Sequence, residues 1–456
     1  MNTVILPMPV RFMSTPSVSR AWSSKLHVTG SRPRLTSLKT FHVIKTLGQG
    51  GSADVYLARD KKTGELSALK VIPKATLDPG DARFTLMEQK VLRELRGSEH
   101  ILRLDASFHD SKNFYLITPF YPGGDLATLL QHQKHFSLRT VTRYAAELLL
   151  AIEILHKKKI IHRDIKPGNV LIDNHGHLVL ADFGLAREFT EDSALSEPRP
   201  DLHGFGRPYT TSSCLGTPEY ASPELLACKP YSFEVDLWAF GVMLYEFLTG
   251  RDAFVATVSP DDPTWVDNLS AHVRCDPLVF HPSDDIDPIT QDFLNKVLAK
   301  KREKRLTIPQ MKAHRFFTFI DWNVVCGQAK PGPWVPPPVA VTPTVESPLS
   351  IAFRSFRHQK DEEMVSAGRL FKPEEDPFPT FTFDPSTPNT PASTDTHEIR
   401  QHNKHDKNTT HLSSSTPAAE SNSVKRHVLT RNWMSEVLVP TQLVRGVKSV
   451  ARNASL

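Results

Sequence analysis

Apolar and polar positions alternate from residue 41 onward, and the alternation breaks at short intervals. Five runs show the two-residue period of a strand, and one run between the third and the fourth shows helical spacing. The strand-like runs cover residues 41–47, 55–58, 67–72, 101–108 and 113–118, and the helical run covers 83–96. This order predicts a small lobe in which one main helix packs on a five-stranded antiparallel sheet.

The pattern becomes helical after a glycine-marked hinge at residues 121–124. Helical spacing then extends over 126–133, 138–158, 234–249 and 288–299. The chain is therefore predicted to be an α+β protein of two lobes. The small lobe covers residues 41–120, and a larger, mainly helical lobe covers 121–319.

Composition separates this folded region from both ends of the chain. The 39% of hydrophobic residues can bury a core, but the 36 prolines concentrate after residue 330. Residues 1–45 carry seven Lys and Arg and no acid. We expect a disordered basic arm over 1–40 and a disordered tail over 385–456. A mitochondrial transit peptide is the alternative for the arm.

The cysteines and the hydropathy both favour an ordinary intracellular environment. Cys214, Cys228, Cys275 and Cys326 show no metal-ligand spacing, and a domain of this size needs no disulfide framework. No stretch approaches the roughly eighteen apolar residues of a membrane span. We expect a reducing compartment, the cytoplasm or the nucleus.

A glycine cluster lies between the first two predicted strands. Backbone amides approach phosphate oxygens closely where no Cβ intervenes, as at Gly48, Gly50 and Gly51. An ordinary hairpin is the alternative, whereas a Rossmann motif is excluded because the chain returns as a strand. The candidate phosphate-binding residues are Leu47, Gly48, Gln49, Gly50, Gly51, Ser52, Ala53, Asp54 and Val55.

Charged residues in the next two elements can serve the same ligand. Lys70 lies in the third strand and Glu88 in the helix, and each alone is typical of a surface charge. Together they can serve one function: the Lys70 ammonium binds the α- and β-phosphates of ATP, and the Glu88 carboxylate holds that ammonium in place.

The most specific signal is the run His-Arg-Asp-Ile-Lys-Pro-Gly-Asn at 162–169, followed by Ala-Asp-Phe-Gly at 181–184. Phosphoryl transfer needs a carboxylate for the attacking hydroxyl, a cation near the transferred group and oxygen ligands for Mg²⁺. Asp164 and Lys166 can supply the first two. Asn169 and Asp182 can supply the metal ligands.

With these motifs, residues 41–319 resemble a eukaryotic protein kinase domain. The resemblance implies a bilobal fold with ATP in the cleft, Asp164 as the catalytic base and Lys70 paired to Glu88. It also implies a nucleotide pocket completed by Ala68, Thr118, Pro119, Tyr121, Asp125 and Leu171.

The resemblance extends to the segment that docks a polypeptide substrate. Residues 216–224 look like the end of an activation segment, in which Thr217 contacts the substrate. Glu224 would pair with Arg305, and Asp236 would anchor the catalytic loop. Lys166 and Thr217 are typical of serine/threonine kinases, so the implied activity is transfer of the ATP γ-phosphate to protein Ser or Thr. A pseudokinase or scaffold is the alternative.

Further motifs resemble the branch of protein kinases A, B and C (AGC kinases). Gly-Gly-Asp-Leu at 123–126 is similar to its hinge exit, where Asp125 would take the ribose and a basic substrate residue. Residues 320–384 resemble its C-terminal tail, with a hydrophobic motif at 378–383. Its candidate regulatory residues are Phe378, Phe381, Thr382 and Phe383; the alternative is a Phe-rich patch in a disordered tail.

The activation segment carries a further candidate switch. The resemblance implies that an upstream kinase phosphorylates Ser213, whose phosphate Arg163 would bind. Thr211 and Ser212 remain possible targets because the sequence beside Cys214 departs from the usual pattern. The expected partners are thus protein substrates, with a basic residue upstream of the target as one option, and an upstream kinase. No nucleic acid is expected.

Overall fold

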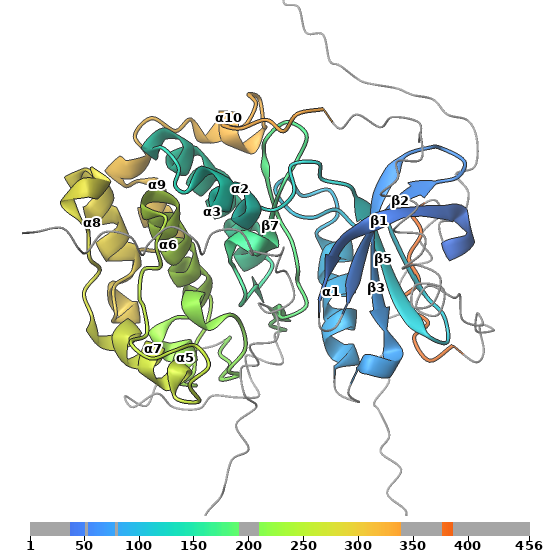
Figure 1. Cartoon of the computed structure of the whole chain (residues 1–456), viewed down its shortest axis with the longest axis horizontal. Helices are drawn as coiled ribbons and strands as arrows, with labels where there is room; N and C mark the ends of the chain where they lie inside the picture. Colours follow the sequence, from blue (N-terminus) through green and yellow to red (C-terminus); the bar gives the residue numbers. More distant parts are fainter. Residues whose placement is uncertain (1–36, 51–52, 78–80, 191–208, 339–375, 386–456) are drawn as a thin grey trace, which may run out of the picture.

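The computed structural model describes residues 37–50, 53–77, 81–190, 209–338 and 376–385. Gly51, Ser52 and nearly all of the predicted arm and tail lie outside these residues. In the described part, two lobes lie side by side (Figure 1). One carries a five-stranded sheet and the other is mainly helical, so the predicted bilobal α+β fold is confirmed.

The small lobe is an antiparallel sheet with the strand order β1-β2-β3-β5-β4. Its strands are β1 (Phe41–Gln49), β2 (Asp54–Asp60), β3 (Leu66–Pro73), β4 (Ala106–His109) and β5 (Asn113–Pro119). Helix α1 (Ala82–Glu94) packs on one face. The predicted strand at 101–108 was too long, because β4 begins only at Ala106 and Ile101 bridges to Leu180 of the large lobe instead.

Alternation along β5 shows why these residues form a two-faced sheet. Phe114 and Leu116 join the core shared with α1 and the large lobe, whereas Tyr115 and Ile117 join a second cluster on the opposite face. Leu38 packs against that second cluster within a 3-10 helix, Leu38–Thr40. Residues 37–40 therefore belong to the folded small lobe and not to the predicted disordered arm.

The large lobe is built around a buried helix. Its helices are α2 (Leu126–Gln133), α3 (Leu138–Lys157), α5 (Pro223–Leu226), α6 (Glu234–Thr249), α7 (Trp265–Cys275), α8 (Pro288–Val297), α9 (Ile308–Lys312) and α10 (Trp322–Cys326). Nearly every residue of α6 is buried, because α3 and α8 pack against it. A helix that is apolar on all sides is typical of such a central position.

Short strands and 3-10 turns bring polar loops to the edge of the large lobe that faces the sheet. The strands are β6 (Ile160–Ile161), β7 (Val170–Ile172), β8 (Leu178–Leu180) and β9 (Arg187–Glu188). The 3-10 turn Pro167–Asn169 is part of these loops. Besides Leu38–Thr40, the other described 3-10 turns are Lys74–Thr76 in the small lobe and Pro218–Tyr220, Pro282–Asp284, Arg302–Lys304 and Arg315–Phe317 in the large lobe. The antiparallel pairs β6-β9 and β7-β8 hold the two predicted catalytic motifs next to each other.

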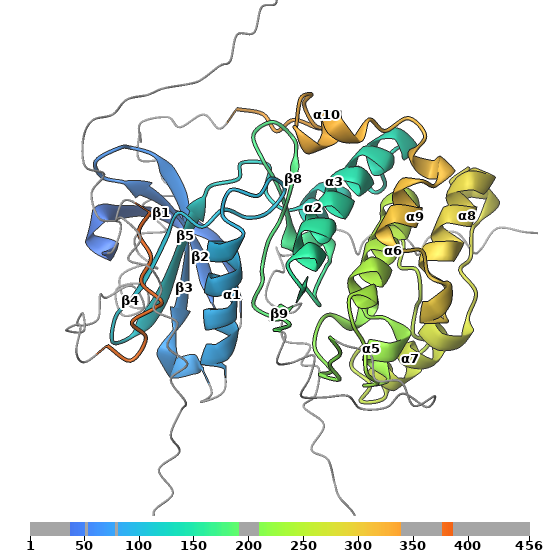
Figure 2. The ribbon, with the colours of Figure 1, turned by 180° about the vertical axis from the view of Figure 1, so that it is seen from behind.

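The C-terminal part of the described chain returns to both lobes. Behind the large lobe, the amide of Gly332 donates to the carbonyl of His175 at 2.9 Å. Residues 376–385, drawn in orange, run beside β4 of the small lobe (Figure 2). Among the described residues, no helix combines the length and the apolar character needed to cross a bilayer.

Candidate active site

The loop that carries Asp164 is fixed by a buried carboxylate of α6. Asp236 accepts hydrogen bonds from the backbone amides of His162 (3.0 Å) and Arg163 (2.9 Å). It also lies 2.9 Å from His156 Nε2. Burial opposes the ionisation of Asp236, but these hydrogen bonds and nearby histidines outweigh it, so its pKa lies below the ordinary value. The core of the large lobe thus positions the loop.

Asp164 is the centre of a hydrogen-bond network between the catalytic loop and the activation segment. Asn169 Nδ2 donates to Asp164 Oδ2 at 2.9 Å, and Thr217 Oγ1 donates to Asp164 Oδ1 at 2.6 Å. Lys166 Nζ lies 2.9 Å from Asp164 Oδ2 and donates to Thr217 Oγ1 at 2.7 Å. The structure thus brings together a carboxylate, an ammonium and an amide that the sequence places on one loop.

Lys70 joins the two lobes electrostatically. Its Nζ donates to both oxygens of Glu88, at 2.8 and 2.9 Å, and to Asp182 Oδ1 at 3.4 Å. Burial disfavours the charged ammonium, but the two carboxylates outweigh it, so the pKa of Lys70 lies above its ordinary value. The pKa of Asp182 is lowered in the same way: burial opposes its ionisation, and Lys70 overcomes it. Both groups are charged at neutral pH.

The residues predicted to bind the adenine side lie along β3, β5 and the start of α2. Ala68 pairs with Thr118 across the sheet, and Thr118 is buried. Pro119 ends β5, and Leu171 forms an isolated bridge with Asp125. These segments meet where the two lobes join. Tyr121 is half-buried in the connecting segment.

Asp125 makes a contact that the sequence analysis did not include. Its Oδ1 accepts from the amide of Thr128 at 2.8 Å, and its Oδ2 accepts from Thr128 Oγ1 at 2.9 Å. The carboxylate is therefore the N-cap of α2. The predicted contacts of Asp125 with ribose and with substrate stay predictions.

The end of the activation segment packs directly on the catalytic loop. Gly216 has φ = +115°, and a Cβ there would lie 2.5 Å from the carbonyl oxygen of Arg163. Only glycine fits this close approach, which brings the next residue, Thr217, to Asp164. Further on, Arg305 Nη2 donates to Glu224 Oε2 at 2.8 Å in a buried pair.

The predicted contact of Arg163 with a phosphate on Ser213 concerns a modified residue and stays a prediction. Arg163 Nε donates to the carbonyl of Leu185 at 2.6 Å. Arg187, which the sequence analysis did not single out, donates from Nη1 to Thr211 Oγ1 at 2.9 Å. β9 places Arg187 beside Thr211, and the sequence did not reveal this contact because the two residues are 24 positions apart. The phosphorylation of Ser213 stays a prediction.

The cysteines also differ from expectation. The structure links Cys214 to Cys228 in a disulfide, which the sequence analysis did not predict. Cys275 and Cys326 are free and exposed. Sequence spacing alone did not indicate this pair, because the segment between the two cysteines must turn back for them to meet.

A second functional candidate that the sequence analysis missed is an acid on α6. Glu246 Oε2 accepts from the hydroxyl of Tyr220 at 2.7 Å, beside the segment that begins at Thr217. Burial and, to a smaller extent, the charge of Asp252 raise the pKa of Glu246 to about 7, against the effect of the Tyr220 hydrogen bond. A Glu in the last, mainly apolar turns of this helix was the available signal.

The hydrophobic motif lies against the small lobe. Phe381 is fully buried and its ring centroid lies 4.8 Å from that of Phe114 in β5. Phe383 pairs with Ser107 of β4 through two backbone hydrogen bonds, at 2.8 and 3.0 Å. Phe378 also packs on Phe114, whereas Thr382 is exposed. The three aromatic residues therefore form a packed contact in this structure.

This fold and site define a protein kinase. Residues 41–317 match the family model described as "Protein kinase domain", and the chain belongs to that family. It is 36% identical over 297 residues to the serine/threonine protein kinase ypkA of Aspergillus fumigatus, which covers 64% of this chain and 43% of ypkA. It is 32% identical over 306 residues to the cAMP-dependent protein kinase type 3 of Saccharomyces cerevisiae, covering 66% of this chain and 70% of that protein.

Another relative is the serine/threonine-protein kinase gad8 of Schizosaccharomyces pombe, 34% identical over 304 residues. That alignment covers 66% of this chain and 49% of gad8. The chain thus spans about half or less of the length of ypkA and gad8. These relatives and the motifs described above assign it to the AGC branch of eukaryotic serine/threonine protein kinases.

Proposed function

We propose that the chain is an active serine/threonine protein kinase that transfers the γ-phosphoryl group of ATP to proteins. The observation that carries this proposal is a pair of polar clusters. One joins Lys70 of the small lobe to Glu88 and to Asp182 of the large lobe, and the other joins Asp164 to Lys166 and Asn169. A scaffold without catalysis would have no need for these two clusters.

Each side chain has a role that follows from its contacts. Asp164 accepts the proton of the attacking hydroxyl and orients its oxygen, and Lys166 adds positive charge near the transferred group. Lys70 binds the α- and β-phosphates while Glu88 holds its ammonium in place. These groups act by position and charge, since phosphoryl transfer requires little covalent participation from the protein.

Asn169 and Asp182 fit a divalent cation, and we propose Mg²⁺. The amide nitrogen of Asn169 donates to Asp164, which leaves its amide oxygen as an acceptor. Oxygen donors of this kind suit Mg²⁺, which is bound by few protein ligands together with substrate phosphates. When bound, the ion would neutralise charge on the phosphates.

Substrates with a basic residue near the target Ser or Thr are part of the proposal. Tyr220 belongs to the segment expected to dock the peptide, and Glu246 and Asp252 lie beside it. Two neighbouring acids favour a cationic side chain. An upstream kinase acting on the activation segment, and a cytoplasmic or nuclear location that supplies ATP and protein substrates, complete the proposal.

The test is phosphate incorporation by the full chain with Mg·ATP and mixed basic peptides. Asp164→Asn keeps the size of the side chain but removes the base, so activity should fall by about 10²–10⁴-fold. Asp285→Asn, at an exposed position outside the site, is the matched control and should retain full activity. Equal rates in wild type and Asp164→Asn would reject the catalytic proposal.

A further inference from the structure

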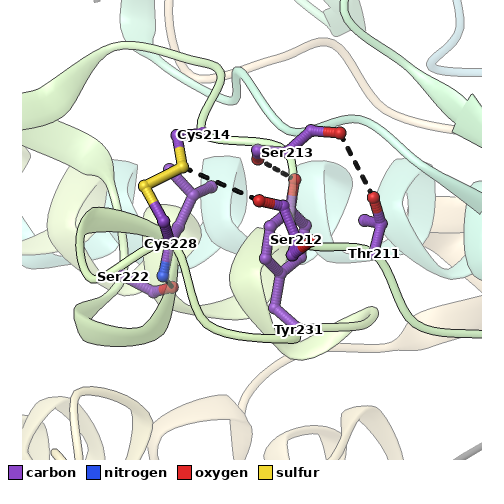
Figure 3. Close-up of a disulfide and its surroundings, with 8 residues drawn as sticks. Thr211, Ser212, Ser213, Cys214, Ser222, Cys228 and Tyr231 are labelled. Carbon is purple, nitrogen blue, oxygen red and sulfur yellow. Dashed lines mark hydrogen bonds between the residues drawn. A yellow bond between two sulfur atoms is a disulfide. The ribbon is translucent and has the colours of Figure 1, made fainter. Parts of the chain in front are cut away.

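A covalent link joins the activation segment to the end of α5. Cys214 precedes Thr217 by three residues, and Cys228 follows the last residue of α5 by two. Figure 3 shows the two side chains meeting from neighbouring loops. Their Cα atoms are 5.3 Å apart, within the range of about 4.4–6.8 Å that a disulfide spans without moving the backbone.

The loop closed by this bond contains the substrate-docking segment. The two cysteines are 14 residues apart, and between them lie Thr217, which contacts Asp164, and Glu224, which contacts Arg305. A cross-link limits the conformations of the loop that it closes. The bond therefore acts on the residues that connect the activation segment to the catalytic loop.

Backbone pairing brings the same two stretches together independently of the sulfur atoms. The amide of Thr211 donates to the carbonyl of Tyr231 at 3.0 Å, and the amide of Tyr231 donates back at 2.9 Å. The hydroxyl of Tyr231 also donates to the carbonyl of Ser213 at 2.7 Å (Figure 3). These contacts do not involve the sulfur atoms, so they favour the return of the two cysteines to each other after reduction.

Solvent can reach this pair. Cys228 is exposed and Cys214 is half-buried. Attack by a thiol or a thiolate on a disulfide requires such access. Cys275 and Cys326 are also exposed but are unpaired, which makes them internal controls for nonspecific oxidation.

We propose that Cys214 and Cys228 form a reversible redox modification site that staples the docking segment to the large lobe. The oxidant is a low-molecular-weight disulfide. One cysteine thiolate attacks it and forms a mixed disulfide, releasing one small thiol. The second cysteine attacks the protein sulfur of that mixed disulfide and releases the other small thiol. The cysteine pair loses two electrons, the oxidant gains them, and the two cysteine protons end on the released thiols.

The oxidised form holds residues 211–217 in the observed arrangement, and reduction frees them to exchange with other conformations. Oxidation should therefore slow amide hydrogen exchange in this segment and lower the KM for a peptide substrate. The effect on KM rests on the proposed kinase activity. The effect on exchange does not.

The experiment equilibrates the full-length chain with reduced and oxidised glutathione in defined ratios. Peptide mass spectrometry without reduction should reveal the Cys214–Cys228 link in the oxidised samples. Exchange of the amides of 211–217 should be about tenfold slower than in the reduced protein. Cys214→Ser and Cys228→Ser should each keep the exchange rates of the reduced protein in either buffer, and Cys275→Ser should behave as wild type.

Persistence of two free thiols under the oxidising ratio would overturn the proposal. So would a formed link that leaves the exchange of 211–217 unchanged. A kinase assay on the same samples separates the two proposals. Absence of phosphate transfer with a normal exchange response would reject the activity alone, whereas transfer without an exchange response would reject the redox site alone.

Discussion

Two residues of the catalytic loops adopt backbone conformations that are uncommon for side chains with a Cβ. Arg163 has φ = 71° and Asp182 has φ = 60°, both in the left-handed region. Such conformations persist where surrounding contacts compensate for them, and they concentrate at functional sites. Here the amide of Arg163 donates to Asp236, and the carboxylate of Asp182 meets Lys70.

Glu246 leads to a prediction about pH. Burial raises its pKa to about 7, so the carboxyl is largely neutral at about pH 6 and charged at about pH 8. We expect the KM for an arginine-containing peptide to fall about tenfold over this interval, measured by steady-state kinetics. Glu246→Gln should remove this dependence, and an uncharged peptide should not show it. An unchanged pH profile in the variant would contradict this role.

The raised pKa of Glu246 also predicts how Glu246→Gln changes thermal stability. The pKa of Glu246 is about 7 in the folded protein and 4.5 in the unfolded chain. The unfolded chain therefore ionises first as the pH rises from about 4.5 to 7, and the free energy of unfolding falls over this interval. Glu246→Gln should therefore melt at a higher temperature than wild type at pH 8. The difference should vanish at about pH 4, where both states of the wild-type carboxyl are protonated.

Between elements, the hydrophobic motif connects the tail to α1 and β4. Gln89 of α1 donates from Nε2 to the carbonyl of Phe381 at 3.2 Å, and Ser107 of β4 donates to the same oxygen at 2.6 Å. Gln89 is the neighbour of Glu88 in α1. Docking of the tail therefore restricts the helix that carries the partner of Lys70.

We predict that Phe381→Ala lowers activity while the domain stays folded. Loss of a buried Phe costs roughly 3–5 kcal/mol, which is enough to release the tail. We expect kcat/KM to fall by about tenfold or more, and Thr382→Ala to cause a smaller loss. Phe319→Ala, at a side chain that is 97% exposed, is the matched control. Full activity in both Phe381→Ala and Thr382→Ala would eliminate the tail contact as a regulator.

The buried ion pair between Arg305 and Glu224 should contribute strongly to thermal stability. Arg305→Ala leaves Glu224 buried without its partner, at a cost of about 3–5 kcal/mol. For a domain of this size we expect Tm to fall by roughly 10 °C in a calorimetric scan. Arg251→Ala removes an exposed ion pair with Asp284 and should change stability by less than about 1 kcal/mol. Similar Tm values for the two variants would show that the buried pair has no special role.

The two lobes as a unit offer a test of ligand binding that does not depend on turnover. Lys70 comes from the sheet and Asp182 from the helical lobe, so a ligand that both contact stabilises the lobes together. Mg·ATP at 100 times its Kd should add about 2.7 kcal/mol to the unfolding free energy. Thermal denaturation should show this as a rise in Tm that needs Mg²⁺.

Asp182→Asn should lose the Mg²⁺-dependent part of that rise, and Asp285→Asn should keep it. If ATP raised Tm equally with and without Mg²⁺ in the wild type, Asp182 would not be a metal ligand. The comparison uses the same full-length protein throughout.

Local pattern was sufficient for much of this architecture. Strands β3 and β5 show alternation, and helices α2 and α6 show helical spacing. Both patterns arise because apolar side chains must face a core, and each is visible over a few residues. The motif around Asp164 was equally readable, because its chemistry needs particular residue types at close spacing. The strand predicted at 101–108 was too long because its first apolar residues contact the large lobe and do not pair in the sheet.

Contacts between distant segments could not be read in this way. Arg187 reaches Thr211 from β9, and Cys214 meets Cys228 only because the intervening loop turns back. Glu246 becomes functionally interesting only once Tyr220 is packed against it. The periodicity of hydrophobic residues and the spacing of motifs indicate which face of an element is buried. The pairing of polar side chains depends on how the elements pack against one another in the tertiary structure.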